Sequence, residues 1–359
     1  METLQLTMGM LDLMVRPAFC VKDGIIVGAN QDAQRLLIET GTPVSALLPQ
    51  DAEEYDHFQT GCLYLTIHVM GQSMAASVTK NAEFNIFILE HDADMVELNA
   101  MALAAQELRE PLSNVMTVAD RLFPVVSADA NMQDHVSRIN RGLFQMLRVI
   151  SNMSDAPRYM QDTQSNMTVR NITAIFEEIF RKVTPMLEQA GVHLEFKNLQ
   201  DQIYTLTDIE KLERAVYNIL SNSLKFAPRD STIQATVTQH HRKIYLSIHD
   251  SGTGVTPSIR ANIHTRYQRQ PGLEDSRFGI GLGMVLIRAA AAAHGGTVLM
   301  EYPEGGGVRI TMTMRIDQSA ASTLQSNLIS VDYAGDRDHA LIELSDSLPA
   351  KLYQSENIN

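Results

Sequence analysis

The spacing of apolar residues changes twice along this chain of 359 residues. Residues 1–92 hold short runs in which apolar and polar positions alternate, a pattern typical of strands. Residues 93–156 repeat apolar positions every three or four residues, which predicts helices, and residues 167–316 mix both patterns. Residues 317–359 start polar, and their second half could add a strand or a helix to a neighbour. The pattern therefore predicts a multidomain α+β protein with a tail of unknown role.

The N-terminal region, residues 1–92, has the pattern of a small α+β domain. Residues 17–41 predict a strand, an Asp-Gly turn, a second strand and then a helix that begins after Asn30. Two further strand-like runs lie at residues 62–70 and 84–92. This order resembles a PAS sensor domain, which implies a role in signal input. Any other small α+β domain is the alternative.

Residues 93–156 predict two helices joined by a short connection at residues 124–134. Their apolar positions form a heptad-like seam. A lone antiparallel hairpin would leave one seam exposed, so we expect two copies to pair as a four-helix bundle in a homodimer. The alternative is a helical pair docked on its own neighbours. The seam positions are Leu98, Ala105, Leu108, Leu112, Val115, Ala119 and Leu122 on the first helix and Val136, Ile139, Leu143, Met146, Ile150 and Met153 on the second.

Residues 167–316 predict an α/β sandwich. Helices are expected at 172–189, 208–226 and 282–294, and strands at 192–196, 233–239, 244–249, 297–301 and 308–314. His240 and His241 fall in the turn between two of these strands. Because no cysteine or third histidine is near them in the sequence, a solvated turn is favoured over a metal site.

Composition excludes several classes of protein. The formal net charge of −13 argues against a nucleic-acid binder, which needs a basic surface to neutralise phosphates. No apolar run is long enough for a transmembrane helix, and the N-terminus lacks the features of a signal peptide. Cys20 and Cys62 are too few for a disulfide framework or a zinc motif, so the cytoplasm is the expected location.

Three short segments together predict a nucleotide site: Tyr217–Phe226, Asp250–Gly254 and Gly279–Gly283. In the first segment, offsets of four and three place Asn218, Asn222 and Lys225 on one face of a helix. An amide oxygen is a hard ligand of the kind that Mg²⁺ prefers, and a lysine one turn further can reach phosphate oxygens.

The other two segments supply an acceptor and open backbone. Asp250 ends a strand, where a buried carboxylate can accept the exocyclic amine of adenine. Glycines at two positions after it let the backbone approach a flat base, and three more lead into a helix whose free N–H groups favour phosphates. The polar stretch Val255–Phe278 has the composition of a mobile lid. The glycines are Gly252, Gly254, Gly279, Gly281 and Gly283.

The order of these segments resembles the Bergerat-type (GHKL) ATP-binding domain shared by sensor histidine kinases and the gyrase/MutL ATPases. His264–Arg269 is similar to the aromatic box that precedes the lid in the kinases. The resemblance implies that Asn222 holds Mg²⁺, that Asn218 supports the phosphates, that Asp250 reads adenine and that the glycines close on the triphosphate. No Walker A sequence is present, which disfavours a P-loop enzyme.

The helical pair resembles the dimerisation and phosphoacceptor hairpin of the same kinases, whose first helix carries an H-E-L-R-T-P-L box. The matching stretch here is QELREPL, in which Gln106 replaces the phosphoacceptor histidine. An amide nitrogen has no free lone pair for attack on phosphorus. Glu107, the vestigial base, would have nothing to deprotonate, and Glu110 adds a carboxylate that repels phosphate. His135, on the second helix, is the other histidine of the pair. We therefore expect no autophosphorylation at the usual site.

Two functions remain open for a chain with this organisation. One is a cytoplasmic kinase-like protein of a two-component system, which binds ATP and Mg²⁺ and transfers phosphate in trans to a response regulator or a kinase paralogue. The other is a pseudokinase that binds ATP and controls a partner by conformation. A serine kinase of the anti-sigma type shares the pocket but normally lacks the hairpin, so the sequence disfavours it.

Overall fold

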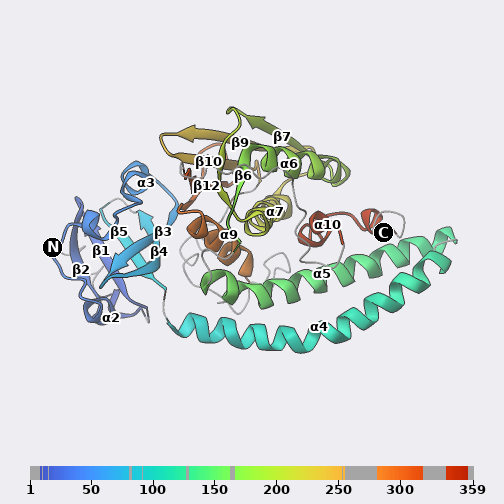
Figure 1. The fold of residues 1–359 in the computed structure, drawn as a ribbon, viewed down its shortest axis with the longest axis horizontal. Coiled ribbons are helices and arrows are strands. Elements are labelled where there is room, and N and C mark those ends of the chain that lie inside the picture. Colours follow the sequence, from blue (N-terminus) through green and yellow to red (C-terminus); the bar gives the residue numbers. More distant parts are fainter. Residues whose placement is uncertain are drawn as a thin grey trace.

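The computed structural model describes residues 9, 11–14, 16–80, 83–90, 92–126, 129–161, 166–252, 254, 281–317 and 337–354. Figure 1 shows three parts: an N-terminal sheet with short helices, a long pair of helices, and an α/β domain above that pair. The chain is a mixed α/β protein, as expected. Within the described part, no helix is both long and apolar enough to cross a membrane.

The N-terminal part is an antiparallel sheet with small helices around it. Asn30 caps α2 (Gln31–Arg35), and its side-chain oxygen also accepts the backbone N–H of Ala18. That residue therefore fixes both the helix start and the first strand. One strand of the sheet was not predicted, namely β4, because its run of serine and alanine does not alternate. The other elements are β1 (Ala18–Lys22), β2 (Ile25–Ala29), η1 (Val44–Leu47), α3 (Ala52–His57), β3 (Cys62–Val69), β4 (Gln72–Lys80) and β5 (Asn85–Leu89).

The long helices are α4 (Asp92–Val126) and α5 (Ala130–Gln161). They pack along one another, and α5 lies between α4 and the α/β domain (Figure 1). The connection is shorter than predicted, because α4 continues through Pro124 for two more residues. A proline near a helix end removes only one backbone hydrogen bond, which the helix tolerates there.

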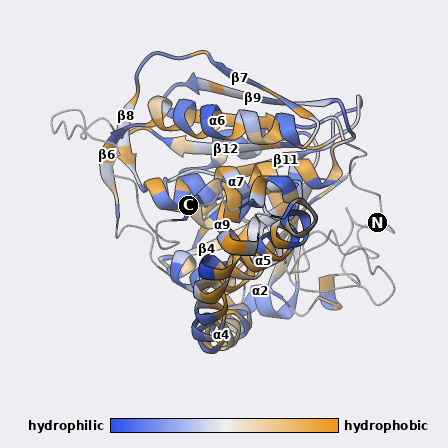
Figure 2. Ribbon diagram, turned by 90° about the vertical axis from the view of Figure 1, so that its right-hand side faces the viewer, coloured by the Kyte–Doolittle hydropathy of each residue, from blue (hydrophilic) through white to orange (hydrophobic). Residues whose placement is uncertain are grey.

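The α/β domain places its helices against a sheet. α6 packs on β7, and α7 packs on β10 and on α9. Orange apolar and blue polar residues share α6 and α7 in Figure 2, as expected of helices with one buried face. The predicted helices and main strands are present, whereas the small β6–β8 pair was not predicted. The elements are β6 (Thr168–Asn171), α6 (Ile172–Gln189), β7 (Val192–Asn198), β8 (Tyr204–Thr207), α7 (Ile209–Phe226), β9 (Ser231–His240), β10 (Lys243–His249), α9 (Leu282–Ala293), β11 (Val298–Glu301) and β12 (Arg309–Arg315).

The two sheets join into one. β3 of the N-terminal part pairs antiparallel with β11 of the α/β domain, with Tyr64 opposite Val298. The result is a 10-stranded sheet in the order β2-β1-β5-β4-β3-β11-β12-β10-β9-β7. Side chains reinforce this junction, since Lys243 of β10 contacts Glu54 of α3 at 2.5 Å. The sequence did not predict this pairing.

The C-terminal tail is docked on the body of the protein. α10 (His339–Glu343) and η3 (Ala350–Tyr353) pack on α5, and α10 also contacts α7. Leu341, Leu344 and Tyr353 are buried in the same hydrophobic core as the α/β domain. The tail thus adds a short helix to its neighbours, one of the two outcomes that the sequence left open.

Candidate functional site

Helix α7 carries the first segment of the predicted site. The Asp208 side chain caps it by accepting the backbone N–H of Lys211 at 3.1 Å. Asn222 is half-buried and forms no hydrogen bond within the described part of the chain. Asn218, one turn earlier, is only 1% exposed, and its side chain donates to the carbonyl oxygen of Arg214 at 2.8 Å. Asn222 is therefore available to bind a ligand, whereas the Asn218 side chain is already hydrogen-bonded within the protein.

Asp250 directly follows β10, beside the last turn of α7. Its Oδ1 accepts the backbone N–H groups of Gly252 at 2.9 Å and Val308 at 3.3 Å. Burial raises the pKa of this carboxyl, and the hydrogen bonds from Gly252, Val308 and Ser223 act in the opposite direction. A buried, oriented carboxyl of this kind suits an acceptor for an exocyclic amine.

Glycines are required around Asp250 by close backbone contact. A Cβ on Gly252 would lie 2.8 Å from both Asp250 Oδ1 and the Phe226 carbonyl oxygen. A Cβ on Gly307, whose φ is +77°, would lie 1.7 Å from the Asp250 carbonyl oxygen. Gly254 also has a positive φ, at +69°. Sequence reasoning missed Gly307, although the run of three glycines at 305–307 before a strand was an available signal.

The third segment joins the same place. Gly281 is the N-cap of α9 with φ +83°, and its Cα faces open space. A Cβ on Gly283 would lie 2.8 Å from Asn218 Oδ1, so the start of α9 packs against the asparagine face of α7. The structure therefore brings Asn218, Asp250 and the helix start together from distant parts of the sequence. Gly279, the whole of the expected lid and the aromatic box lie outside the described residues.

A cluster of charged side chains closes one side of this site. Arg148 of α5 donates to Asn218 Oδ1 at 3.1 Å and to Glu343 of α10 at 3.3 Å. Arg214 of α7, fully buried, donates to Glu343 at 3.1 Å and to Asn152 at 2.7 Å. No motif in the sequence pointed to these residues, because α5 and the tail are remote from α7 along the chain.

Lys225 also has a partner from the tail. Its Nζ lies 2.9 Å from a carboxylate oxygen of Asp346. Burial lowers the pKa of Lys225, with a further contribution from Arg148, while Asp346 acts in the opposite direction. For Asp346, burial alone would raise the pKa, but Arg148 and Lys225 outweigh it and the pKa is lowered. The pair lies where the sequence placed phosphate contacts.

The phosphoacceptor position lies on the outer helix. Gln106, Glu107 and Glu110 are all exposed on α4, and His135 is exposed on α5. α5 lies between α4, the helix that carries Gln106, and the α/β domain (Figure 1).

His240 and His241 gain a neighbour that the sequence could not show. Ligand-type atoms of these two residues and Glu53 all lie within 4.8 Å of one another. Glu53 belongs to α3 of the N-terminal part, which meets the β9–β10 turn. The side chains of His240 and Glu53 are 65% and 41% exposed. This exposure fits the solvated turn that was predicted.

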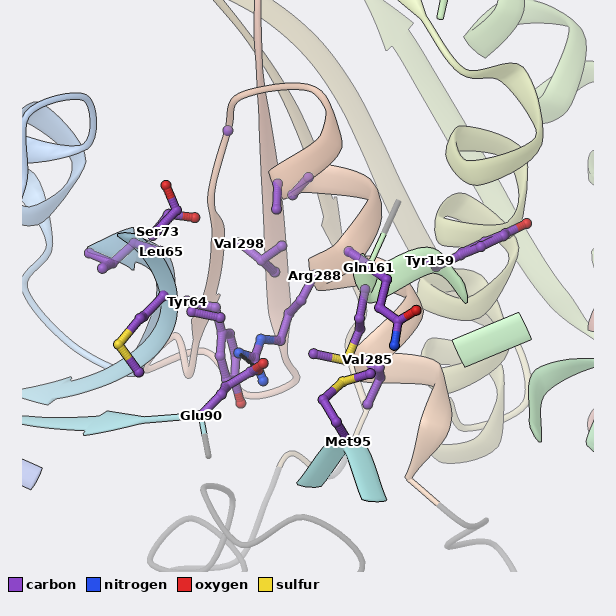
Figure 3. Close-up of a pocket in the computed structure, with 18 of the residues that line it drawn as sticks. Tyr64, Leu65, Ser73, Glu90, Met95, Tyr159, Gln161, Val285, Arg288 and Val298 are labelled. Carbon is purple, nitrogen blue, oxygen red and sulfur yellow. Dashed lines mark hydrogen bonds and ion pairs between the residues drawn. The ribbon is translucent and has the colours of Figure 1, made fainter. Parts of the chain in front are cut away.

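A separate cavity of about 380 Å³ lies between the N-terminal part and the α/β domain. Figure 3 shows Arg288 of α9 beside Glu90 and Tyr64 at its wall. The Arg288 guanidinium lies 4.5 Å from the centre of the Tyr64 ring and forms an ion pair with Glu90. The wall includes none of the predicted nucleotide-binding residues, so this cavity is distinct from the site at α7.

Comparison with known proteins agrees with the site. Residues 207–318 match the family described as histidine kinase-, DNA gyrase B-, and HSP90-like ATPase. The chain is 26% identical over 242 residues to histidine protein kinase DivJ of Caulobacter vibrioides, which covers 63% of this chain and 40% of that relative. It is 25% identical over 221 residues to sensor histidine kinase WalK of Bacillus subtilis, covering 60% of this chain and 36% of the relative.

A solved structure, full-length ShkA in complex with AMPPNP, matches with a TM-score of 0.49 and 20% identity, covering 61% of this chain and 46% of that one. A likeness of this degree carries no argument about function. The chain spans less than half the length of both curated relatives. Residues 207–318, which include Asn218, Asn222 and Asp250, therefore match the histidine kinase-like ATPase family, and the similarity to the two kinase relatives extends over 63% and 60% of the chain.

Proposed function

We propose that this protein is a two-component signalling protein that binds Mg-ATP at the site on α7. The observation that carries the proposal is the half-buried Asn222, unpartnered within the described residues, on the helix that also meets Asp250 and the start of α9. An unpartnered amide oxygen fits the hard ligands that Mg²⁺ takes in proteins. Asp250 would accept the adenine amine, and the N–H groups at the start of α9 would face the phosphates.

Phosphoryl transfer within the hairpin is not part of the proposal. Gln106 has no nucleophilic nitrogen, and it is exposed on the outer helix. The bound Mg-ATP would instead serve transfer to a histidine or carboxylate of a partner, either a kinase paralogue or a response regulator. Glu107 would keep no role as a base.

A second candidate function is control of a partner by conformation alone. It is favoured by the way that α5 is bonded to α7: Arg148 reaches Asn218, and Asn152 reaches Arg214. A nucleotide that altered these bonds would move the hairpin, because both arginines are buried and have few other arrangements. In this case the protein is an ATP-dependent pseudokinase.

The proposed active form is a homodimer. The hairpin exposes an apolar stripe that includes Leu108, Val115 and Leu122 on α4 and Ile139 and Met146 on α5, each more than half exposed. Side chains of this size are costly to leave in water along a helix face. A second copy of the hairpin would cover the stripe as a four-helix bundle.

The N-terminal part is proposed as the PAS-like input module, acting in the cytoplasm. Its sheet is continuous with that of the ATP-binding domain, because β3 pairs with β11. A conformational change caused by a ligand in the N-terminal part would therefore act directly on the sheet of the nucleotide-binding domain. Cys20 and Cys62 are free and buried, as suits a reducing compartment. The cognate partner and the input ligand are left open.

The test of Mg-ATP binding is calorimetry on the full chain. Asn222→Ala should raise the dissociation constant of Mg-ATP by about tenfold or more, equivalent to about 1.4 kcal/mol. Asn198→Ala is the matched control, because its side chain donates to Glu177 and accepts the backbone N–H of Gln200, both outside the predicted site. Equal affinity of wild type and Asn222→Ala would contradict the proposed metal ligand.

Transfer is tested separately with γ-labelled ATP. Label on an added response regulator or kinase paralogue, lost in Asn222→Ala, would establish transfer in trans. Tight binding with neither hydrolysis nor transfer would establish the pseudokinase instead. A Gln106→His variant that labels itself would show that only the acceptor has been lost.

A further inference from the structure

The C-terminal segment Asp338–Tyr353 is bound as a ligand would be. Tyr353 is fully buried and packs edge-on against Phe144 of α5, with ring centres 5.3 Å apart. The Asn140 amide donates to the Tyr353 carbonyl oxygen at 3.0 Å. The Tyr353 hydroxyl in turn donates to the Leu341 carbonyl oxygen at 2.6 Å, which folds the segment back on itself. These contacts fix the C-terminal end of the segment on α5, while His339 near its other end contacts Glu213 of α7.

Between these anchors the segment presents carboxylates to basic groups. Glu343, with no exposed surface, lies between Arg148 and Arg214. Asp346 contacts both Arg148 and Lys225. The backbone adds to this match, since Arg141 of α5 donates to the carbonyl oxygens of residues 345 and 346. Two acids three residues apart thus bind three basic side chains contributed by α5 and α7.

Two of the side chains that contact Glu343 and Asp346 are also the ones predicted to bind the phosphates of ATP. Lys225 is the predicted phosphate lysine, and its partner is Asp346 at 2.9 Å. Asn218, the predicted phosphate support, donates to Glu343 at 3.4 Å. A triphosphate carries several negative charges, and carboxylates repel it at short range in a partly buried site. Of the three predicted residues on α7, Asn222 has no partner in the segment or elsewhere among the described residues.

We propose that Asp338–Tyr353 is an intramolecular competitor of ATP, which occupies the phosphate end of the site through Glu343 and Asp346 and must leave for the triphosphate to bind. This inference rests on the proposed Mg-ATP site. With such a competitor, the apparent dissociation constant of ATP equals the intrinsic constant divided by the fraction of molecules in which the site is open. The protein would then respond to any partner that takes the segment away.

The competing role can be distinguished from a purely structural one. If the segment only held Lys225 in place, loss of Asp346 would weaken nucleotide binding. If it competes, loss of Asp346 would strengthen binding, because Lys225 becomes available. Asp346 is the better position to change, since its side chain is 30% exposed, whereas Glu343 is fully buried among arginines.

The first experiment measures Mg-ATP affinity of the full chain by calorimetry. Asp346→Asn should lower the dissociation constant about five- to tenfold, the gain expected when one partly buried ion pair no longer competes. Asp134→Asn is the matched control, since it removes the same charge from an exposed pair with Arg138 on α5. Circular dichroism checks that both variants are folded. Unchanged or weaker binding by Asp346→Asn overturns the competitor role.

The second experiment needs no substitution. Hydrogen exchange of wild-type protein should show faster exchange in residues 339–353 with saturating Mg-ATP, and a smaller change with Mg-AMP, which lacks the outer phosphates. Unchanged or slower exchange with bound Mg-ATP overturns the inference while leaving the proposed function intact. Absence of Mg-ATP binding in wild type and in Asp346→Asn overturns the proposed function, and the inference with it.

Discussion

Several polar residues of this protein are buried, and their hydrogen bonds are made within the protein. Asp250 and Asn218 lie in a predicted nucleotide motif, yet both are nearly inaccessible and hydrogen-bonded to protein groups. His294, which ends α9, is a similar case. Its Nδ1–H donates to the Ala290 carbonyl oxygen at 2.7 Å, and its Nε2 accepts the Asp208 N–H at 3.1 Å. These two bonds require the neutral ring.

His294 should therefore make the fold sensitive to mild acid. Burial lowers its pKa below the ordinary value of 6.5, with Lys211 adding to the effect while the Ala290 bond and Asp208 oppose it. In the unfolded chain this histidine has the ordinary pKa of 6.5, whereas in the folded protein its pKa is lower. Its contribution to stability is therefore complete above pH 6.5 and is lost as the pH falls through and below that value. We expect the free energy of unfolding, measured in urea, to fall between pH 7 and about pH 5.5.

A His294→Gln variant provides the comparison. It should cost about 1–3 kcal/mol at pH 7, because one or both buried bonds are lost. Its stability should also vary less with pH than that of wild type over the same interval. The same slope in both proteins would assign the pH dependence to other histidines.

At the scale of elements, the sequence predicted long periodic segments well and irregular contacts poorly. The helices of the α/β domain fall within a residue or so of their predicted bounds, because one apolar face and a cap define each. β4 was missed because serine and alanine do not alternate clearly. Asn222 and Asp250 could be predicted from their segments, whereas Arg148 and Glu343 could not, since their roles arise from packing between distant elements.

The exposed stripe of the hairpin leads to a prediction about assembly. Val115→Glu combined with Leu122→Glu should convert a dimer into a monomer, because each charge would be buried in the bundle interface. Both side chains are 54% exposed in the single chain, so the variant should keep the monomer fold. Sedimentation at micromolar concentration measures the change. Arg138→Glu, at an exposed position beside the stripe, is the control, and a wild type that is already monomeric would refute the dimer.

At the scale of the whole molecule, one carboxylate joins three parts of the chain. Glu343 connects the tail to Arg148 of α5 and to Arg214 of the α/β domain. Arg148, Arg214 and Glu343 are all buried, so none of them can be hydrated unless the structure rearranges. Moving the tail, the long helices or the α/β domain relative to one another would therefore cost the free energy of these ion pairs.

Removal of Glu343 should be costly for the fold. Glu343→Ala removes one of the two carboxylates that each buried guanidinium contacts, leaving Asp346 to Arg148 and Asp155 to Arg214. The free energy of unfolding should fall by about 3 kcal/mol, the lower end of the range for a broken buried pair. Glu178→Ala, which removes an exposed pair with Arg181, should cost less than about 1 kcal/mol. Urea unfolding of the full chain measures both, and similar small losses would show that the buried network contributes little.

The shared sheet also constrains how the protein can be divided. Separation near residue 91 would leave β3 and β11 each with a row of unpaired backbone groups, bordered by the apolar side chains of Leu63 and Val298. Such strands readily pair with the wrong chain and aggregate. The isolated α/β domain should accordingly be poorly soluble unless a lysine is placed on β11, the more so because Cys62 and Tyr64 of β3 belong to its core.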